Sequence, residues 1–355
     1  MSLEVLVAGT MIVSLTFYAL LGGADYGGGV WDLFARGPRA KEQRELIAHA
    51  IGPVWEANHV WLILVVVILF TAFPTAFAVI ATALHVPLTL LLVGIVLRGA
   101  AFTFRTYDSQ RDDVQRRWSY VFSIASTITP VLLGVALGAV ASGRIRVENG
   151  VVTTGFWWSW LAPFPFAVGL FALALFAFLA AVYLTLEARG GELQEDFRRR
   201  ALVSGAVVGL LALTVFVLAG DGAPKVRAGI WASAWALPLH VATGVCAVGA
   251  LYTLWARRYA LARLFAAAQV TFILWGWALA QFPAIVEPDI TIRTAAAPRI
   301  TLQLLLAALA VGALVLFPSF FYLFRVFKGH TAFAPLAGEP GEISDTAIKT
   351  GESAR

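Results

Sequence analysis

Cysteine and charge are the scarcest features of this sequence. Cys246 is the single cysteine among 355 residues, which excludes an intrachain disulfide, a C-x-x-C redox pair and a C-x-x-C-H haem attachment. Charged residues make up only 13% of the chain, whereas hydrophobic residues make up 60%. A soluble domain of this length does not have such a composition, and a helical protein with many membrane spans does.

The few charges that are present do not indicate nucleic-acid binding. Lys and Arg outnumber Asp and Glu by 26 to 21, a formal net charge of +5. These cations fall in separate short loops rather than in one basic patch, so we predict no nucleic-acid partner, and we predict no metal site. The first segment, MSLEVLVAG, has no basic residues ahead of its apolar run, so we expect a retained span rather than a cleaved signal peptide.

Nine apolar segments reach the ~20 residues that a helix needs to cross a bilayer. The predicted fold is therefore all-α: a polytopic integral membrane protein with one transmembrane domain over 1–330. The remainder, 331–355, is predicted to be a flexible tail, because Gly, Pro, Glu and Ser replace apolar residues there. The predicted spans are 3–34, 46–72, 76–98, 118–141, 162–187, 201–219, 232–255, 261–282 and 301–325.

Lys and Arg are distributed unevenly over the loops between these spans. Counted in alternate loops and their flanking helix ends, 18 lie on one side and 6 on the other. Cytoplasmic loops carry the excess of positive residues in membrane proteins. The count predicts an N-terminus outside the membrane and a C-terminal tail in the cytoplasm.

Two acidic residues lie well inside the predicted spans. Asp25 precedes Arg36 by eleven residues, and Glu56 follows Arg44 by twelve. At 1.5 Å per helical residue both would lie roughly 16–18 Å from the charged turn between the first two helices, at matching depth on antiparallel neighbours. A buried carboxylate is costly in a membrane, so this depth predicts a site for protons, ions or substrate.

Further titratable groups extend this site toward the charged turn. Four of them repeat at near-helical spacing and are predicted to form one stripe on the second helix: Glu45, His49, Glu56 and His59. Pro53 interrupts that helix, which frees a backbone carbonyl and leaves room for water. On the first helix Asp32 lies seven residues after Asp25, on the same face. Together these residues predict a line of proton carriers.

Each part of this line has a simpler interpretation. The outer members, Glu45, His49 and Asp32, could be interfacial groups that water solvates. The two inner acids could form a structural pair with a basic partner. Arg98, which ends the third span, is the candidate partner, because its stem can snorkel toward the membrane surface.

Glycines and histidines in the spans were considered as binding groups. Gly23 and Gly27 have small-x-x-x-small spacing, which predicts close helix packing rather than a binding role, and no Lys-Ser/Thr pair follows them as in a phosphate loop. His85 and His240 lie at similar predicted depth and could face each other as a bis-His haem site requires. Each is a single His on an apolar face, where hydrogen-bonded packing is commoner, so we predict no haem in this chain.

The motifs around the two acids resemble those of a known family. They are G-A-D-Y-G-G-G-V-W-D-L at 23–33, P-V-W-E-A-N-H-V-W at 53–61 and F-P-A-I-V-E-P-D at 282–289. With Arg98, they resemble subunit II of the cytochrome bd-type ubiquinol oxidases, and look closest to the branch called cyanide-insensitive quinol oxidase. The resemblance covers nearly the whole chain.

The resemblance implies nine spans arranged as two four-helix bundles plus one peripheral helix. It also implies a complex in the bacterial cytoplasmic membrane that oxidises quinol, reduces dioxygen to water and adds to the proton gradient without pumping. A related subunit I would carry the quinol site, two b-type haems and one d-type haem, while this chain would hold no haem ligand. The resemblance leaves a small accessory subunit and a structural quinone open.

At residue level, the resemblance implies roles for the inner acids. Asp25 matches the family's first-helix acid, Glu56 matches a second-helix acid that is Asp in some relatives, and Arg98 matches a basic position beside them. The implied role is proton delivery from the cytoplasm toward the partner, with uptake predicted beside Asp32 and His49. Two other functions stay open from the residues alone: a secondary transporter coupled to protons through the two inner acids, and a purely structural subunit.

Overall fold

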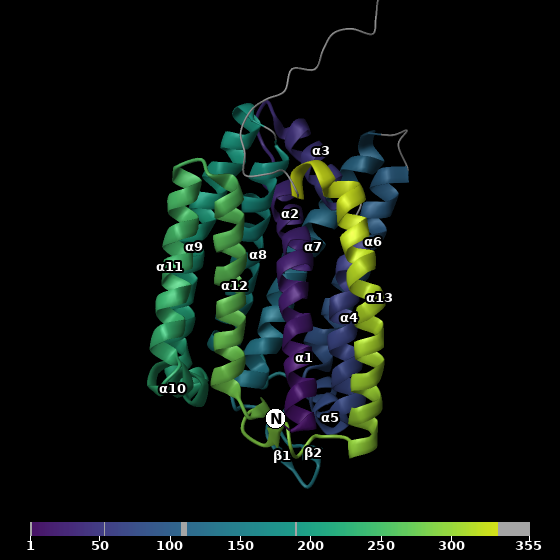
Figure 1. Cartoon of the computed structure of the whole chain (residues 1–355), viewed down its shortest axis with the longest axis vertical. Coiled ribbons are helices and arrows are strands. Elements are labelled where there is room, and N and C mark those ends of the chain that lie inside the picture. The colour runs from purple at the N-terminus through teal and green to yellow at the C-terminus, as the bar shows by residue number, and fades with distance from the viewer. Residues whose placement is uncertain (1, 53, 108–111, 189, 333–355) are drawn as a thin grey trace, which may run out of the picture.

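The computed structural model describes residues 2–52, 54–107, 112–188 and 190–332. Within these ranges, nine helices are long and apolar enough to cross a membrane, as predicted. They stand side by side along the longest axis of the molecule (Figure 1). Pro53 and all but two residues of the predicted tail lie outside the described residues. The nine spans are Leu3–Leu33, Trp55–Ala72, His85–Arg105, Arg117–Ala141, Pro163–Glu187, Gly191–Gly222, Ala236–Trp255, Tyr259–Gln281 and Arg299–Phe327.

The first span consists of three segments. A π-helical turn, η1 (Tyr18–Gly22), joins α1 (Leu3–Phe17) to α2 (Gly23–Leu33). The later helices are α3 (Ala40–Ile51), α4 (Trp55–Ala72), α5 (Pro74–Ala83), α6 (His85–Tyr107), α7 (Asp112–Ala141), α8 (Pro163–Glu187), α9 (Gly191–Gly222), α10 (Pro224–Ala232), α11 (Ala236–Trp255), α12 (Tyr259–Gln281) and α13 (Arg299–Ala332). The strands are β1 (Val147–Glu148), β2 (Val151–Val152), β3 (Ala284–Val286) and β4 (Ile290–Thr291).

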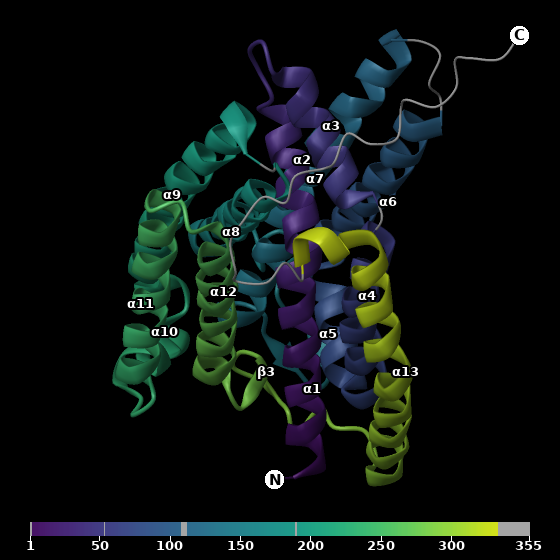
Figure 2. The same ribbon diagram turned by 45° about the horizontal axis from the view of Figure 1, so that its top comes forward.

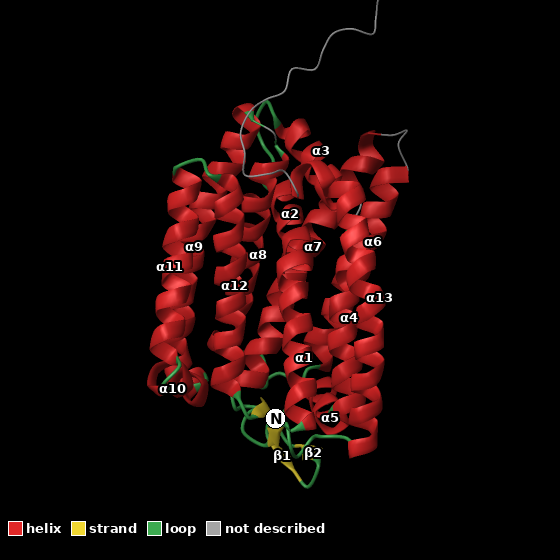
Figure 3. Ribbon diagram, in the orientation of Figure 1, coloured by secondary structure: helices red, strands yellow, loops and turns green. Residues whose placement is uncertain are grey.

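The two ends of the molecule differ in secondary structure and in charge. The strands form two short antiparallel hairpins, β1–β2 and β3–β4, at the end where the N-terminus lies (Figure 3). The opposite end carries α3 together with the α2–α3, α8–α9 and α11–α12 connections (Figure 1). Because the more positive set of loops falls there, we call it the basic end. That the basic end faces the cytoplasm stays a prediction.

The span predicted over 46–72 is not one continuous helix, in agreement with the interruption predicted within it. The chain instead forms α3 and α4, with a break between Ile51 and Trp55. Val54 has φ −127° and ψ −11°, outside the helical region, so the backbone turns before α4 begins. The expected span over 76–98 also differs: Pro74 occupies the first turn of the separate short helix α5, and α6 continues to Tyr107.

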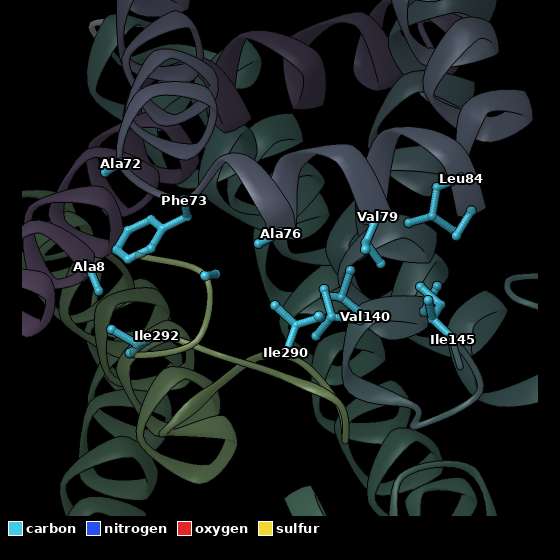
Figure 4. Close-up of a cluster of buried hydrophobic side chains, with 14 of the residues drawn as sticks. Ala8, Ala72, Phe73, Ala76, Val79, Leu84, Val140, Ile145, Ile290 and Ile292 are labelled. Atoms are coloured by element: carbon cyan, nitrogen blue, oxygen red, sulfur yellow. The ribbon is translucent and has the colours of Figure 1, made fainter. Parts of the chain in front are cut away.

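Burial places α8 at the centre and α13 at the edge. In α8, 61% of the membrane-spanning stretch is buried, against 6% in α13, which packs mainly on α1 and α4. At the N-terminal end, side chains from α4–α5, α7 and β4 form one apolar cluster that includes Phe73, Val140 and Ile290 (Figure 4). The grouping of the remaining helices into two four-helix bundles stays a prediction.

Glycines bring α2 into backbone contact with its neighbours. A Cβ at Gly27 would overlap the carbonyl oxygen of Phe176 on α8, and one at Gly23 would lie 2.6 Å from the ring of the same residue. A Cβ at Gly29 would overlap Ser126 on α7. The prediction that Gly23 and Gly27 serve helix packing is therefore confirmed. This packing holds the polar residues of α2 in the interior.

Candidate functional site

Asp25 is the buried acid of α2. Only 5% of the residue is exposed, and its carboxylate accepts a hydrogen bond from the side-chain amide of Asn58 on α4 at 2.8 Å. Asn58 is itself buried, and its Oδ1 has no hydrogen-bond partner among the described residues. Sequence reasoning missed Asn58, although it lies in the same nine-residue motif as Glu56. Its neutral side chain carries no signal of its own.

Glu56 lies at the surface of α4, in its first turn, and is exposed. Asp25, by contrast, is buried on α2. Two residues correspond to about 200° of rotation around a helix, so a helix that turns Asn58 inward turns Glu56 outward. The two acids therefore differ in exposure, and a relay between them stays a prediction.

Glu56 begins an apolar stripe on the surface of α4. The exposed residues that follow it at helical spacing are Val60, Ile63, Val67 and Phe70. A carboxylate at the end of such a stripe is costly if lipid covers it. Cover of this surface by another protein stays a prediction.

Arg98 on α6 is a buried cation among aromatic rings. It is 1% exposed, and its guanidinium carbon lies 4.7 Å from the ring centre of Tyr26, 5.4 Å from Phe122 and 6.0 Å from Trp55. Its Nη1 lies 3.5 Å from Nε2 of His59. Its Nε and Nη2 make no hydrogen bond to any described residue. Cation–π attraction therefore holds the side chain, and two donor nitrogens remain available.

His59 joins Arg98 to a pair of tyrosines. The rings of Tyr18 in η1 and Tyr26 in α2 each lie 5.9 Å from the His59 ring, centre to centre. The two tyrosine hydroxyls are 3.3 Å apart, and both residues are buried. Sequence reasoning identified His59 and Arg98 but neither tyrosine, because aromatic residues in a span are usually packing groups.

Asp32 is buried rather than solvated. Its carboxylate accepts hydrogen bonds from Nη1 of Arg105 at 3.1 Å and from the hydroxyl of Ser123 at 2.7 Å. These contacts tie α2 to α6 and α7. The interfacial, solvated alternative for Asp32 is therefore wrong.

The stripe predicted for Glu45, His49, Glu56 and His59 is also wrong. The break between α3 and α4 separates its two halves, and the first three residues are exposed while His59 is turned toward Arg98. His49 and Glu45 lie on α3 at the basic end, and Glu45 pairs loosely with Lys41 at 3.9 Å.

The histidines considered for haem do not face each other. His85 begins α6 and His240 lies on α11, and these helices occupy opposite sides of the molecule in both views (Figures 1 and 2). Each imidazole ring instead forms a local hydrogen bond with a backbone carbonyl of a preceding residue. Nδ1 of His85 lies 3.0 Å from the Thr82 carbonyl oxygen, and Nδ1 of His240 lies 2.6 Å from the Ala236 carbonyl oxygen. This pair does not fit a haem, and the described residues contain no cluster of His, Cys, Asp and Glu suited to a metal ion.

A family model decides the identity. The model described as cytochrome bd terminal oxidase subunit II matches residues 3–327. The chain belongs to the cytochrome bd oxidase subunit II family. It is thus a subunit of a respiratory quinol oxidase, an oxidoreductase of the bacterial inner membrane, and not a secondary transporter. Family membership implies a subunit I partner and haem in the complex.

Similar proteins agree with this family. The putative cytochrome bd menaquinol oxidase subunit II of Bacillus subtilis is 24% identical over 92% of this chain and 96% of the relative. The cytochrome bd-I ubiquinol oxidase subunit 2 of Escherichia coli is 27% identical over 59% of this chain and 54% of the relative. The bd oxidase structure from Geobacillus thermodenitrificans shares the fold, with a TM-score of 0.78 and 22% identity over 92% of this chain and 99% of that one. Assignment to the cyanide-insensitive branch stays a prediction.

Proposed function

We propose that this bd oxidase subunit II is haem-free, assembles with a haem-bearing subunit I and carries protons toward it. The observation that supports this proposal best is the interior position of Asp25. Its carboxylate is buried on a membrane-spanning helix and bonded to the neutral amide of Asn58. A carboxyl group in such surroundings is suited to take up and release a proton.

Buried polar atoms without protein partners support a path around Asp25. They are Asn58 Oδ1, Arg98 Nε and Nη2, and the hydroxyl oxygens of Ser126 and Thr129, all within the described ranges. Such atoms are commonly satisfied by ordered water. Water bonded to them would supply the mobile hydrogen bonds that proton transfer requires.

Subunit I covers Glu56 in this proposal. The apolar stripe of α4 lies open on this chain, and α6 also exposes apolar residues, including Leu92 and Val96. A permanent apolar interface over α4 and α6 would remove the carboxyl of Glu56 from lipid. Glu56 would then be the last proton carrier of this chain before the partner, where quinol and oxygen react.

The direction of transfer follows from the charge bias. The basic end is the cytoplasmic side in this proposal, with the N-terminus outside, and protons are taken up there beside His49 and Asp32. They pass to Asp25, through bonds near His59 and Arg98, and on to Glu56. Arg98 places a positive charge beside His59 on this route. A small accessory subunit and a structural quinone stay open.

Glu56→Gln tests the proposal in the purified complex. The variant should assemble with normal haem content but consume oxygen more slowly with quinol as donor, because the amide cannot carry a proton. Glu56→Asp should keep much of the activity, since the carboxylate remains. Glu45→Gln, an exposed acid on α3, serves as the matched control and should have the parental rate. Full assembly of Glu56→Gln with the parental rate across the neutral pH range would contradict the role of Glu56.

A further inference from the structure

A cavity of about 250 Å³ opens at the basic end, between the α2–α3 connection and the first turns of α9. Four arginines line it, together with one acid and one amide: Arg36, Arg39, Arg199, Arg200, Asp196 and Gln43. None of these residues belongs to the site around Asp25. The cavity is therefore a second polar feature that proton transfer does not use.

The only acid in the cavity wall is already neutralised. Arg39 donates two hydrogen bonds to Asp196, from Nε and Nη2, each at 2.9 Å. Gln43 donates a third from Nε2 at 2.9 Å, and Nη1 of Arg39 pairs with Glu192. The hydrogen bond to Asp196 raises the pKa of Arg39 above its ordinary value, so Arg39 is charged and committed to this pair. The hydrogen bonds of Asp196 are therefore committed to Arg39 and Gln43.

Arg200 is fixed with one donor unused. Its guanidinium lies over the rings of Phe197 at 5.1 Å and Trp31 at 5.3 Å, and Nη2 donates to Oε1 of Gln43 at 2.6 Å and to the Phe34 carbonyl at 3.3 Å. No described carboxylate pairs with it. Its Nη1 is buried and has no hydrogen-bond partner among the described residues. A charged donor held in this way is costly unless water or a ligand completes its bonds.

Arg36 is a second cation without an acid. It is exposed at the cavity wall, and no ion pair joins it to a described residue. Arg199, by contrast, lies 3.5 Å from Glu195. Glu195 also pairs with Arg198 at 2.9 Å and with Arg257 at 3.6 Å, so Arg199 shares this acid with two other cations. Arg36 and Arg200 are the two guanidinium groups of the wall that form no ion pair with a described carboxylate.

We propose that this cavity binds a phosphate-bearing anion between Arg200 and Arg36. Guanidinium groups match the oxygens of phosphate through paired charge-assisted hydrogen bonds. The headgroup of an anionic phospholipid and inorganic phosphate share this chemistry. The half-exposed ring of Phe34 borders the cavity at the end of α2, where an acyl chain would leave a bound headgroup.

Lipid retention in the purified complex tests this site. The complex is placed in nanodiscs containing dioleoylphosphatidylglycerol and dioleoylphosphatidylcholine and is then extracted from them. Native mass spectrometry measures which lipid stays bound to the complex. The parental protein should retain phosphatidylglycerol in preference to phosphatidylcholine. Arg200→Gln and Arg36→Gln should each weaken that retention about tenfold, the effect of losing one charge-assisted hydrogen bond. Arg258→Gln, an exposed arginine at the same end outside the cavity, should retain lipid like the parent.

Inorganic phosphate distinguishes the two sources. Displacement of the lipid by phosphate, or phosphate binding that the same two variants weaken, assigns the site to free phosphate. Retained lipid that phosphate does not displace assigns it to a headgroup. The proposal is overturned if the parent shows no preference for the anionic lipid and no phosphate binding, or if both variants behave like Arg258→Gln. Arg36→Gln is at the surface and keeps the test valid if Arg200→Gln does not fold.

Discussion

The side-chain amide of Asn58 donates a hydrogen bond to the carboxylate of Asp25 at 2.8 Å, across the contact between α4 and α2. Glu56, two residues before Asn58, is exposed on the other side of α4. The two inner acids, Asp25 and Glu56, therefore have different surroundings. Asp25 is buried inside this subunit, and Glu56 lies at its surface. Variants of the two should differ in what they disturb.

Asp25→Asn should lower oxygen consumption with little effect on assembly. The new amide oxygen can still accept the bond from Asn58, so packing is kept, but the proton carrier is lost. We expect a decrease of about 100-fold, the lower end of what a positioned acid or base contributes. The measurement is quinol-driven oxygen uptake by the complex, normalised to haem. Asp289→Asn, which alters an ion pair with Arg146 at the opposite end, is the control. Parental turnover by Asp25→Asn would leave Asp25 a packing residue only.

Both the charge and the planar shape of the Arg98 side chain should contribute to oxygen uptake. Arg98→Lys keeps the charge but loses stacking on Tyr26, Phe122 and Trp55, where a desolvated cation–π contact contributes about 2 kcal/mol. Arg98→Gln loses the charge as well. Oxygen uptake should therefore fall in the order parent, Lys, Gln, and the melting temperature of the complex should fall for both. Equal activity of the two variants would show that the charge of Arg98 does not matter to transfer.

Asp32→Asn should destabilise the protein, because it leaves Arg105 without its anion in the interior. Breaking a buried pair in this way costs about 3–5 kcal/mol. Asp32→Asn combined with Arg105→Gln should recover part of the loss, since no unpaired charge remains. Thermal unfolding of the complex in detergent measures both. Glu45→Gln, which removes the exposed partner of Lys41, should leave the melting temperature unchanged. An additive double variant would mean that the Asp32–Arg105 contact is not a coupled pair.

Gly27→Ala should destabilise the contact of α2 with α8. The added methyl would overlap the backbone carbonyl of Phe176, which cannot rotate away as a side chain could. Overpacking of this kind costs about 1–3 kcal/mol. Gly9→Ala is the matched control in the same span, because a Cβ there meets nothing within 4 Å. The melting temperatures should differ clearly. Similar values for the two variants would mean that the helices separate easily at this point.

The sequence predicted how deep a residue lies in the membrane better than it predicted which way its side chain points around the helix. Apolar run length located the nine spans, and glycine spacing located the packed face of α2. The direction of Glu56 was not predictable by counting from Glu45, because the break before Trp55 interrupts the helical rotation. Spacing carries rotational information only while the backbone stays helical.

Partners of buried polar groups were also beyond sequence reasoning. Asp32 was identified as a candidate, but its contacts with Arg105 and Ser123 come from residues 73 and 91 positions away. Likewise, the sequence did not predict that rings from α2, α4 and α7 surround Arg98. Such contacts depend on how separate helices pack, and one chain's residue order does not specify that packing.

The π-helical turn η1 changes the phase of the first span. A π turn uses about one residue more than an α turn, so the side chains of α1 are offset from those of α2 by roughly one residue's rotation, about 100°. The span therefore behaves as two helices that share one axis but are rotated relative to each other about it. Deleting one residue within η1 would restore a uniform α-helix. The side chains of α1 and the side chain of Asp25 could then no longer both point in their present directions. Chain length before Asp25 is thus a structural parameter in itself, independent of which apolar residues make it up.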